Sequence, residues 1–189
     1  MRERSDYQVH NLSKCFIDLV NSIGYEKVNV KLLTEAAGIN RTTFYQFFSG
    51  KAELAEYICY TYLDKHNEIL AESVCGKDRD SMLRMLDRAF DYIEKNAGAI
   101  RMLWQIQEPT FSPYVVMQQS MSDTVIRVLS PRSSADQLSL KLLADSFAAS
   151  AMATIRIFID NDCRDKNLIT EGICCCCYDG MLTWLDTCK

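Results

Sequence analysis

Nine cysteines are the residues with the most obvious chemistry, and four of them follow one another at positions 174–177. Thiolates bind zinc and similar metals, and accessible thiolates are oxidised. Because consecutive residues of a helix point about 100° apart, only Cys174 and Cys177 share a face there. A closed tetrahedral metal site would need ligands from elsewhere. We therefore interpret these cysteines as structural or interface residues, with thiol or metal sensing as the alternative.

The other residues with catalytic or metal-binding chemistry do not form complete sets. Residues 160–171 have the length of an EF-hand calcium loop, but Arg164 occupies a ligand position and Asp165 stands where that loop needs glycine. Neither His10 nor His66 has the acid and the nucleophile of a hydrolase beside it. We therefore expect no enzyme activity, no metal and no cofactor.

The composition predicts that helices position whatever the chain uses. Of its 189 residues, 48% are hydrophobic, whereas only 7 are Gly and 3 are Pro. Long stretches without either residue leave helices few places to stop and strands few turns. We expect an all-α protein of about nine helices, either as one mid-sized domain or as a small domain joined to a larger one.

The chain shows no sign of secretion or of a membrane span. No segment combines a charged start, an apolar run and a small-residue cleavage site, and no run approaches 18 apolar residues. An odd number of cysteines in a chain of this size favours reduced thiols. We expect a cytoplasmic protein.

The charge is unevenly distributed along the chain. The net charge is −4, so no overall basic field attracts nucleic acid. The first 55 residues nevertheless hold seven Lys or Arg against six Asp or Glu, so the acidity lies in the remainder. Any nucleic-acid binding must come from a local arrangement of residues.

Three helices are predicted within residues 1–50. Ser5 and Asp6 can cap the first helix, in which apolar residues from Leu12 to Ile23 recur at helical spacing. Asn29 and Asn40 are good caps for two short helices over residues 30–37 and 41–48. With Gly38 in the turn between the two short helices, this pattern is typical of a helix-turn-helix.

The remaining residues predict a second, larger helical domain. A long helix over 51–73 connects it to the first domain, which we place at residues 1–50, so that the second domain covers residues 51–189. Its other helices are expected at residues 79–95, 98–107, 113–129, 135–160 and 169–187.

Four short motifs in the N-terminal segment identify a family. They are a Gly24-Tyr25 turn, an Ala37-Gly38-Ile39 hinge, the helix motif Thr43-Phe44-Tyr45-x-x-Phe48, and Lys51-x-x-Leu54. Together they resemble the DNA-binding domain of the TetR/AcrR family of transcriptional regulators, over about residues 8–58. The C-terminal two-thirds resembles that family only in its length and helicity.

The resemblance implies which residues contact double-stranded operator DNA. Three residues lie in the first turn of the recognition helix, where they reach base edges in the major groove: Arg41, Thr42 and Thr43. We predict Arg41 as the main base reader, because a guanidinium can bond guanine bidentately. Further contacts, chiefly to phosphates, are expected from Asn29, Lys31, Asn40, Tyr45, Gln46 and Lys51. Arg2 and Arg4 are either an arm that reaches the DNA or a frayed terminus.

Two positions depart from the family pattern. Phe47 stands where a polar, phosphate-contacting residue is frequent, which removes one anchoring contact. Thr34 stands where alanine is usual, and we expect its hydroxyl to bond back to a carbonyl of its own helix.

The resemblance also implies a homodimer. In the family the last two helices pair with those of a second copy in a four-helix bundle. Small and apolar residues in the two corresponding helices predict the following interface set: Ala149, Met152, Ile173, Cys177, Met181 and Trp184.

An apolar small-molecule effector is the other expected partner. Aromatic and methionine residues of the second domain are candidates for its pocket, although residues of this kind more often belong to a core. The candidates are Phe90, Trp104, Phe111, Tyr114, Met117, Met121 and Phe147. Trp104 and Tyr114 are preferred, because each carries a polar group that needs a partner.

These expectations combine into one functional hypothesis. The chain is predicted to be a ligand-responsive DNA-binding regulator, a repressor that an apolar or aromatic ligand releases from a palindromic operator, although activation stays open. The alternatives are a thiol- or metal-sensing regulator and a helical ligand carrier that does not bind DNA.

Overall fold

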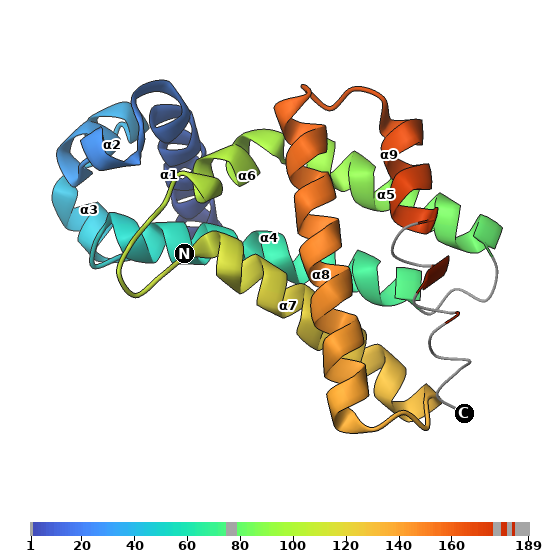
Figure 1. Cartoon of the computed structure of the whole chain (residues 1–189). Helices are drawn as coiled ribbons and strands as arrows, with labels where there is room; N and C mark the ends of the chain where they lie inside the picture. Colours follow the sequence, from blue (N-terminus) through green and yellow to red (C-terminus); the bar gives the residue numbers. More distant parts are fainter. Residues whose placement is uncertain (1, 75–78, 176–178, 181–182, 184–189) are drawn as a thin grey trace. The chain divides into compact units, whose positions relative to one another are not determined.

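A computed structural model describes residues 2–74, 79–175, 179–180 and 183 of the chain. Over these residues it contains nine α-helices, two short 3-10 helices and no β-strand beyond one isolated bridge between Glu108 and Phe111 (Figure 1). The predicted all-α fold is confirmed. The elements are α1 Arg2–Ile23, η1 Tyr25–Lys27, α2 Val30–Ala37, α3 Arg41–Tyr45, α4 Lys51–Val74, α5 Arg79–Lys95, α6 Ala97–Trp104, α7 Pro113–Leu129, η2 Ser130–Arg132, α8 Gln137–Asp160 and α9 Lys166–Ile173.

Most predicted helix bounds agree with the structure within three residues. Helix α1 differs more, because it begins at Arg2, so Ser5 and Asp6, the predicted caps, lie inside the helix. Helix α3 ends at Tyr45, because Gln46 and Phe47 form a turn instead of a further helical turn. Helix α9 begins at Lys166 and ends at Ile173. Most of the predicted continuation of this helix to residue 187 lies outside the described residues.

The chain divides into two compact units that do not follow one another simply in sequence. Unit 1 consists of Met1–Thr61 and Gly98–Tyr114, and unit 2 consists of Tyr62–Ala97 and Val115–Lys189. The division therefore falls inside α4, and the chain returns to unit 1 for α6 and the loop after it.

The core of unit 1 is built on one face of α1. Leu12, Phe16 and Val20 recur at i, i+4 and i+8, and none of them is exposed. The ring of Phe16 meets Tyr25 edge-on with 6.2 Å between centroids. The side-chain amide of Asn11 donates to the carbonyl of Ala37 at 2.9 Å, which ties the end of α2 to α1. These contacts hold α1, η1 and α2 in a fixed arrangement.

The core of unit 2 joins four helices of its own. Phe90 of α5 and Phe158 of α8 are almost fully buried and meet edge-on at 5.0 Å between centroids. The ammonium of Lys166, at the start of α9, lies 2.6 Å from a carboxylate oxygen of Asp87 and also contacts Asp91 on α5. The hydroxyl of Ser122 on α7 donates to Asp145 of α8 at 2.6 Å.

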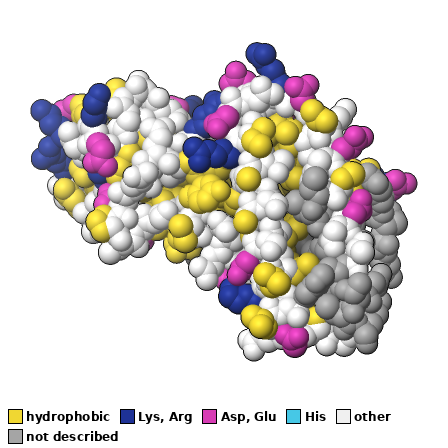
Figure 2. All heavy atoms as spheres, in the orientation of Figure 1, with side chains coloured by type: hydrophobic (Ala, Val, Ile, Leu, Met, Phe, Trp, Pro, Cys, Tyr) yellow, Lys and Arg dark blue, Asp and Glu magenta, His cyan; other side chains and the backbone are white. Residues whose placement is uncertain are grey.

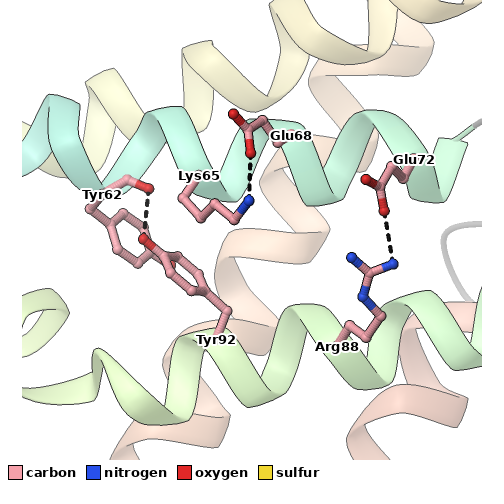
Figure 3. A network of polar contacts seen from close by, with 6 residues as sticks. All are labelled: Tyr62, Lys65, Glu68, Glu72, Arg88 and Tyr92. Carbon is pink, nitrogen blue, oxygen red and sulfur yellow. Dashed lines mark hydrogen bonds and ion pairs between the residues drawn. The ribbon is translucent and has the colours of Figure 1, made fainter.

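Polar groups connect α4 to α5 within unit 2 (Figure 3). The hydroxyl of Tyr92 donates to the backbone carbonyl of Tyr62 at 3.2 Å, and the two rings stack with 5.3 Å between centroids. Nearer the end of α4, Arg88 bonds Glu72 at 2.8 Å. Because this ion pair is more than half exposed, we expect it to fix register more than to stabilise the fold.

Helix α8 is unusually apolar on both sides. It is long and apolar enough to cross a membrane by length and composition, and 44% of its most apolar stretch is buried inside the protein. Hydrophobic side chains also lie along its outer face (Figure 2). Leu138, Leu142 and Ile157 are 79%, 61% and 60% exposed. Exposed apolar residues that recur along one helix indicate a contact surface.

Candidate nucleic-acid interface

The two short helices of unit 1 begin with the caps that the sequence predicts. The side-chain oxygen of Asn29 accepts from the N–H of Leu32 at 3.0 Å, at the start of α2. That of Asn40 accepts from the N–H of Thr43 at 2.8 Å and from its hydroxyl at 2.9 Å. Between the helices Gly38 has a φ of 66°, in the left-handed region that glycine adopts without a steric penalty.

Helix α3 has one buried side and one exposed side. Phe44 is fully buried and Phe48, just beyond the helix, is 6% exposed, so these two rings fix α3 on the core. Arg41 and Thr42, at the start of the helix, are exposed. Tyr45 is 56% exposed. The outward side of α3 is therefore polar and accessible along its whole length.

The remaining polar residues around α3 differ in their exposure and in their contacts. Gln46, in the turn after α3, is exposed, whereas Thr43 is half-buried because its hydroxyl bonds to the cap residue Asn40. Lys31 on α2 is about two-thirds exposed, and its ammonium lies 4.0 Å from Glu35, a distance typical of a weak surface pair. Lys and Arg side chains lie on the part of the surface formed by α2 and α3 (Figure 2).

Lys51, at the start of α4, is engaged inside unit 1. Its ammonium donates to the backbone carbonyl of Tyr25 at 2.9 Å and lies 4.1 Å from the centroid of the Tyr25 ring. Beside it, the N–H of Ser49 donates to Glu53 at 2.6 Å, and this bond holds the pKa of the Glu53 carboxyl below its usual range. The start of α4 therefore already holds a carboxylate, and Lys51 would have to leave the Tyr25 carbonyl in order to meet a phosphate.

The α6 segment is bound to the helix-turn-helix through Tyr25 and Asn21. The hydroxyl of Tyr25 donates to the Glu108 carboxylate at 2.6 Å, and the amide of Asn21 donates to the carbonyl of Gly98 at 2.8 Å. Burial, followed by the bond to Glu108, raises the pKa of Tyr25. Sequence reasoning missed these contacts, because the two pairs are separated by 83 and 77 residues and neither partner has a local signal.

The structure shows the surroundings of Thr34 and Phe47, the two residues that depart from the family pattern. The hydroxyl of Thr34 donates to the carbonyls of Val30 and Lys31 at 2.9 and 3.0 Å, which confirms the predicted bond within its own helix. Phe47 is half-buried in the turn after α3 and presents part of its ring to solvent.

Comparison with known proteins agrees with this geometry. The family model described as bacterial regulatory proteins of the tetR family matches residues 17–58, which span the helix-turn-helix. The HTH-type transcriptional activator FasR of Mycolicibacterium smegmatis is 23% identical over 167 residues, which cover 85% of this chain and 74% of that protein. Residues 17–58 are therefore similar to the DNA-binding segment of tetR-family regulatory proteins.

Solved structures of other proteins share the fold over almost the whole chain. A putative TetR-family regulator of Syntrophomonas wolfei superimposes with a TM-score of 0.76 at 11% identity, over 94% of this chain and 96% of that one. The SmeT–triclosan complex gives 0.67 at 14% identity, over 89% and 90%. The dihydroxyacetone kinase operon activator DhaS gives 0.62 at 20% identity, over 96% and 98%. The C-terminal helices therefore have the fold of this family as well.

Unit 2 contains a small apolar cavity of about 30 Å³. Its lining comes from five helices: His66, Leu70, Leu86, Ala89, Phe90, Ile93, Met121, Phe147, Ala151, Ile155 and Ile173. Three of the predicted pocket residues, Phe90, Met121 and Phe147, are therefore brought together. Met117 is buried in unit 2 but does not belong to this lining.

The other predicted pocket residues lie in unit 1. The rings of Trp104 and Tyr114 meet at 6.1 Å between centroids, and Phe111 is 6% exposed beside the bridge to Glu108. The indole N–H of Trp104 is buried and has no hydrogen-bond partner in the described part of the chain. Sequence reasoning missed His66 as a lining residue, although its spacing of i+4 from both Tyr62 and Leu70 places it on the apolar face of α4.

The predicted interface residues fall into three groups. Ala149 is exposed on α8. Met152 is not exposed at all and Ile173 is only 4% exposed, so both side chains are enclosed within one protomer and offer little surface to a second copy. The remaining three, Cys177, Met181 and Trp184, lie outside the described residues.

The cysteines are spread over buried and exposed positions. Cys174 is buried and Cys175 is exposed, whereas Cys176 and Cys177 lie outside the described residues. Burial, followed by the nearby Glu56 carboxylate, raises the pKa of the Cys59 thiol to about 12, which keeps it protonated. Among the residues that the structure describes, no three His, Cys, Asp or Glu side chains are grouped as a metal site requires.

Proposed function

We propose that this regulator binds a near-palindromic operator in the cytoplasm as a homodimer, and that an apolar small molecule bound in unit 2 changes its operator affinity. The observation that carries the proposal is the outward polar side of α3, with Arg41 exposed in its first turn and Phe44 buried behind it. A helix that is fixed from behind and polar in front is suited to lie in a major groove.

The proposed contacts divide into base readers and phosphate contacts. Arg41 reads a base, and Thr42 and Thr43 contact a thymine methyl or a phosphate. Because the oxygen of Asn40 caps α3, only its amide N–H groups can reach the DNA. Contacts that fix the register on the backbone are proposed for Asn29, Lys31, Tyr45, Gln46 and Lys51.

The proposed dimer uses the exposed side of α8. Leu138, Leu142, Ala149 and Ile157 lie outward on this helix, and burial against a second copy would remove their apolar surface from water. The dimer would place two α3 helices about 34–36 Å apart, in successive major grooves. Small exposed residues such as Ala149 would allow the two copies of α8 to approach closely.

The direction of regulation has two candidate answers. Repression relieved by ligand is our first proposal. Activation is the second, and it is favoured by the names of two similar proteins, FasR and DhaS, which are called activators. In either case the ligand must bind one conformation of the protein more tightly than the other.

Selection from a random duplex pool tests the reading helix. We expect wild-type protein to select a near-palindrome, and Arg41→Ala to lose about 10- to 100-fold in affinity and to relax preference at one base pair per half-site. Arg127→Ala, an exposed arginine on α7, serves as the control and should leave both properties unchanged. An Arg41→Ala protein that selects the same sequence with the same affinity contradicts the proposal.

Sedimentation of Leu142→Arg tests the dimer. The charge on the outer side of α8 should give a folded monomer and weaken operator binding by roughly 100-fold or more, because the two half-sites are no longer linked. Val115→Arg introduces the same charge at another exposed apolar position and should remain dimeric. A dimeric Leu142→Arg protein with wild-type operator affinity would exclude this interface.

A further inference from the structure

We propose that the cavity of unit 2 binds an uncharged, mainly apolar molecule that carries one hydroxyl group, and that this hydroxyl forms a hydrogen bond with Nδ1 of His66. The inference rests on the proposed ligand response of unit 2 and names the chemical class of the ligand. It depends on three features of the cavity, which are its lining, the unmet hydrogen bond of His66 and its size.

The lining of the cavity is apolar except at one position. Ten of its eleven residues are Leu, Ile, Ala, Phe or Met, and the eleventh is His66. Among the described residues of the lining none carries a carboxylate, ammonium or guanidinium, so a charged ligand would lose its hydration without gaining an opposite charge from them. The bulk of the ligand must therefore be apolar and uncharged.

His66 supplies the polar group of this cavity. Its side chain is 4% exposed, and its Nδ1 is buried without a hydrogen-bond partner in the described structure. One face of the imidazole stacks on Tyr62, with 5.7 Å between the ring centroids. A buried polar atom without a partner destabilises the folded protein, and a ligand group that supplies the partner recovers part of this cost.

The protonation state of His66 selects the hydroxyl. Burial lowers its pKa to about 4, and the neighbouring Asn67 side chain offsets this only in part, so the imidazole is neutral at pH 7. In a neutral imidazole one nitrogen donates and the other accepts. Because a hydroxyl both donates and accepts, it can satisfy Nδ1 in either tautomer, whereas a carboxylate can only accept and brings a charge. The ligand class is therefore a phenol or an alcohol and not an acid.

The size of the cavity explains how such a ligand would act on the conformation. A volume of about 30 Å³ accommodates a group the size of a hydroxyl but not the whole of an apolar molecule. The body of the ligand must therefore displace residues such as Met121, whose flexible side chain adapts readily. Displacement of residues from α5, α7 and α8 gives the ligand a preference for one conformation, which is what a regulatory response requires.

Titration calorimetry with three matched probes tests the ligand class on the DNA-free, full-length protein. The probes are 4-ethylphenol, ethylbenzene and 4-ethylbenzoate. We expect 4-ethylphenol to bind about 5- to 10-fold more tightly than ethylbenzene, the increment of one hydrogen bond, and 4-ethylbenzoate to bind most weakly. His66→Phe should remove the preference for the phenol. His10→Phe, the matched change at the other histidine, which is exposed, should retain it.

Nitrogen NMR of histidine-labelled wild-type protein gives a readout that does not need a folded variant. The chain has only two histidines, so both imidazoles can be followed. Addition of 4-ethylphenol should shift the Nδ1 resonance of His66, whereas ethylbenzene should not, and His10 should not respond to either probe. Equal affinity of phenol and hydrocarbon, absence of binding, preference for the benzoate, or an unchanged Nδ1 resonance at saturation would each overturn the proposal. The last result would mean that Nδ1 binds only a buried water molecule.

Operator binding separates this proposal from the proposed function. Measured on the same protein without probe, operator binding that depends on Arg41 would remain if the His66 proposal fails. Selective binding of the phenol would likewise remain if no operator is bound.

Discussion

The recognition helix and the cavity handle polar groups in opposite ways. At α3 the side chains of Arg41, Thr42 and Tyr45 are exposed, and the side-chain oxygen of Asn40 accepts a hydrogen bond from the backbone N–H of Thr43, three residues away. Among the described residues that line the cavity the one polar side chain, His66, is buried, and its Nδ1 has no hydrogen-bond partner in that part of the chain. The polar groups of α3 are therefore either hydrogen-bonded or solvated in the free protein, whereas the cavity contains a buried nitrogen atom whose hydrogen bond is not made.

This difference predicts that the two regions affect the free energy of unfolding differently. An exposed polar side chain is solvated in the absence of DNA, so the side chains of α3 cost the folded protein little stability. Their contribution is to hold the contact groups in position for DNA. A buried, unpartnered imidazole lowers the stability of unit 2 until a ligand group satisfies it. We therefore expect changes at His66 to alter stability and its dependence on pH, and changes at α3 to alter DNA binding more than stability.

The largest expected effect on stability is the pH dependence that His66 causes. Its pKa of about 4 in the folded protein lies below the ordinary value of 6.5, so the unfolded chain takes up the proton first as the pH falls. The contribution of the neutral imidazole to the free energy of unfolding is complete above about pH 7. It is lost between pH 6.5 and 4, by roughly 3 kcal/mol in total. Urea unfolding at pH 7.5 and 4.5, at a fixed protein concentration, measures it.

The comparison between variants isolates the histidine from the carboxylates that also titrate in this range. His66→Phe should lose roughly 2–3 kcal/mol less than wild type between the two pH values. His10→Phe should follow wild type. Parallel losses in wild type and His66→Phe would mean that the imidazole is hydrated, and the contrast between the two regions would then disappear.

A smaller effect is expected at the cap of α3. Asn40→Ala removes the bond to the N–H of Thr43 and should lower the free energy of unfolding by about 1 kcal/mol. Asn40→Asp keeps the cap and the stability, but its negative charge should weaken operator binding. Urea unfolding and fluorescence anisotropy on the selected operator separate the two effects.

The companion change at α2 makes the cap test specific. Asn29→Ala removes the equivalent bond to Leu32 and should lower stability by a similar amount, about 1 kcal/mol. If Asn40→Asp binds the operator as tightly as wild type, the start of α3 does not approach the DNA backbone.

The smallest effect is expected at Thr34. Its buried hydroxyl bonds only to carbonyls of its own helix, which also have their helical N–H partners. Thr34→Ala removes a polar group together with its bond and introduces a better helix former, so stability should change by less than about 0.5 kcal/mol in urea unfolding. A loss above about 1.5 kcal/mol would show that the hydroxyl has a further role.

Local features of this protein could be read from neighbouring residues alone. Asn29 and Asn40 cap helices, Gly38 ends α2, and Thr34 bonds within one helical turn, because each of these interactions joins residues no more than four positions apart. The same short range explains why the outward position of Arg41 relative to Phe44 followed from helical periodicity.

Contacts between distant segments were decided by the tertiary structure. The bond of Tyr25 to Glu108, the inward positions of Met152 and Ile173, and the place of His66 in a cavity lined by five helices depend on how helices pack. The amphipathic pattern of a helix shows that a residue is buried but not against which helix, and α8, apolar on both sides, does not show which side faces the core. Only packing, which must fill the interior without voids, assigns each apolar face its partner.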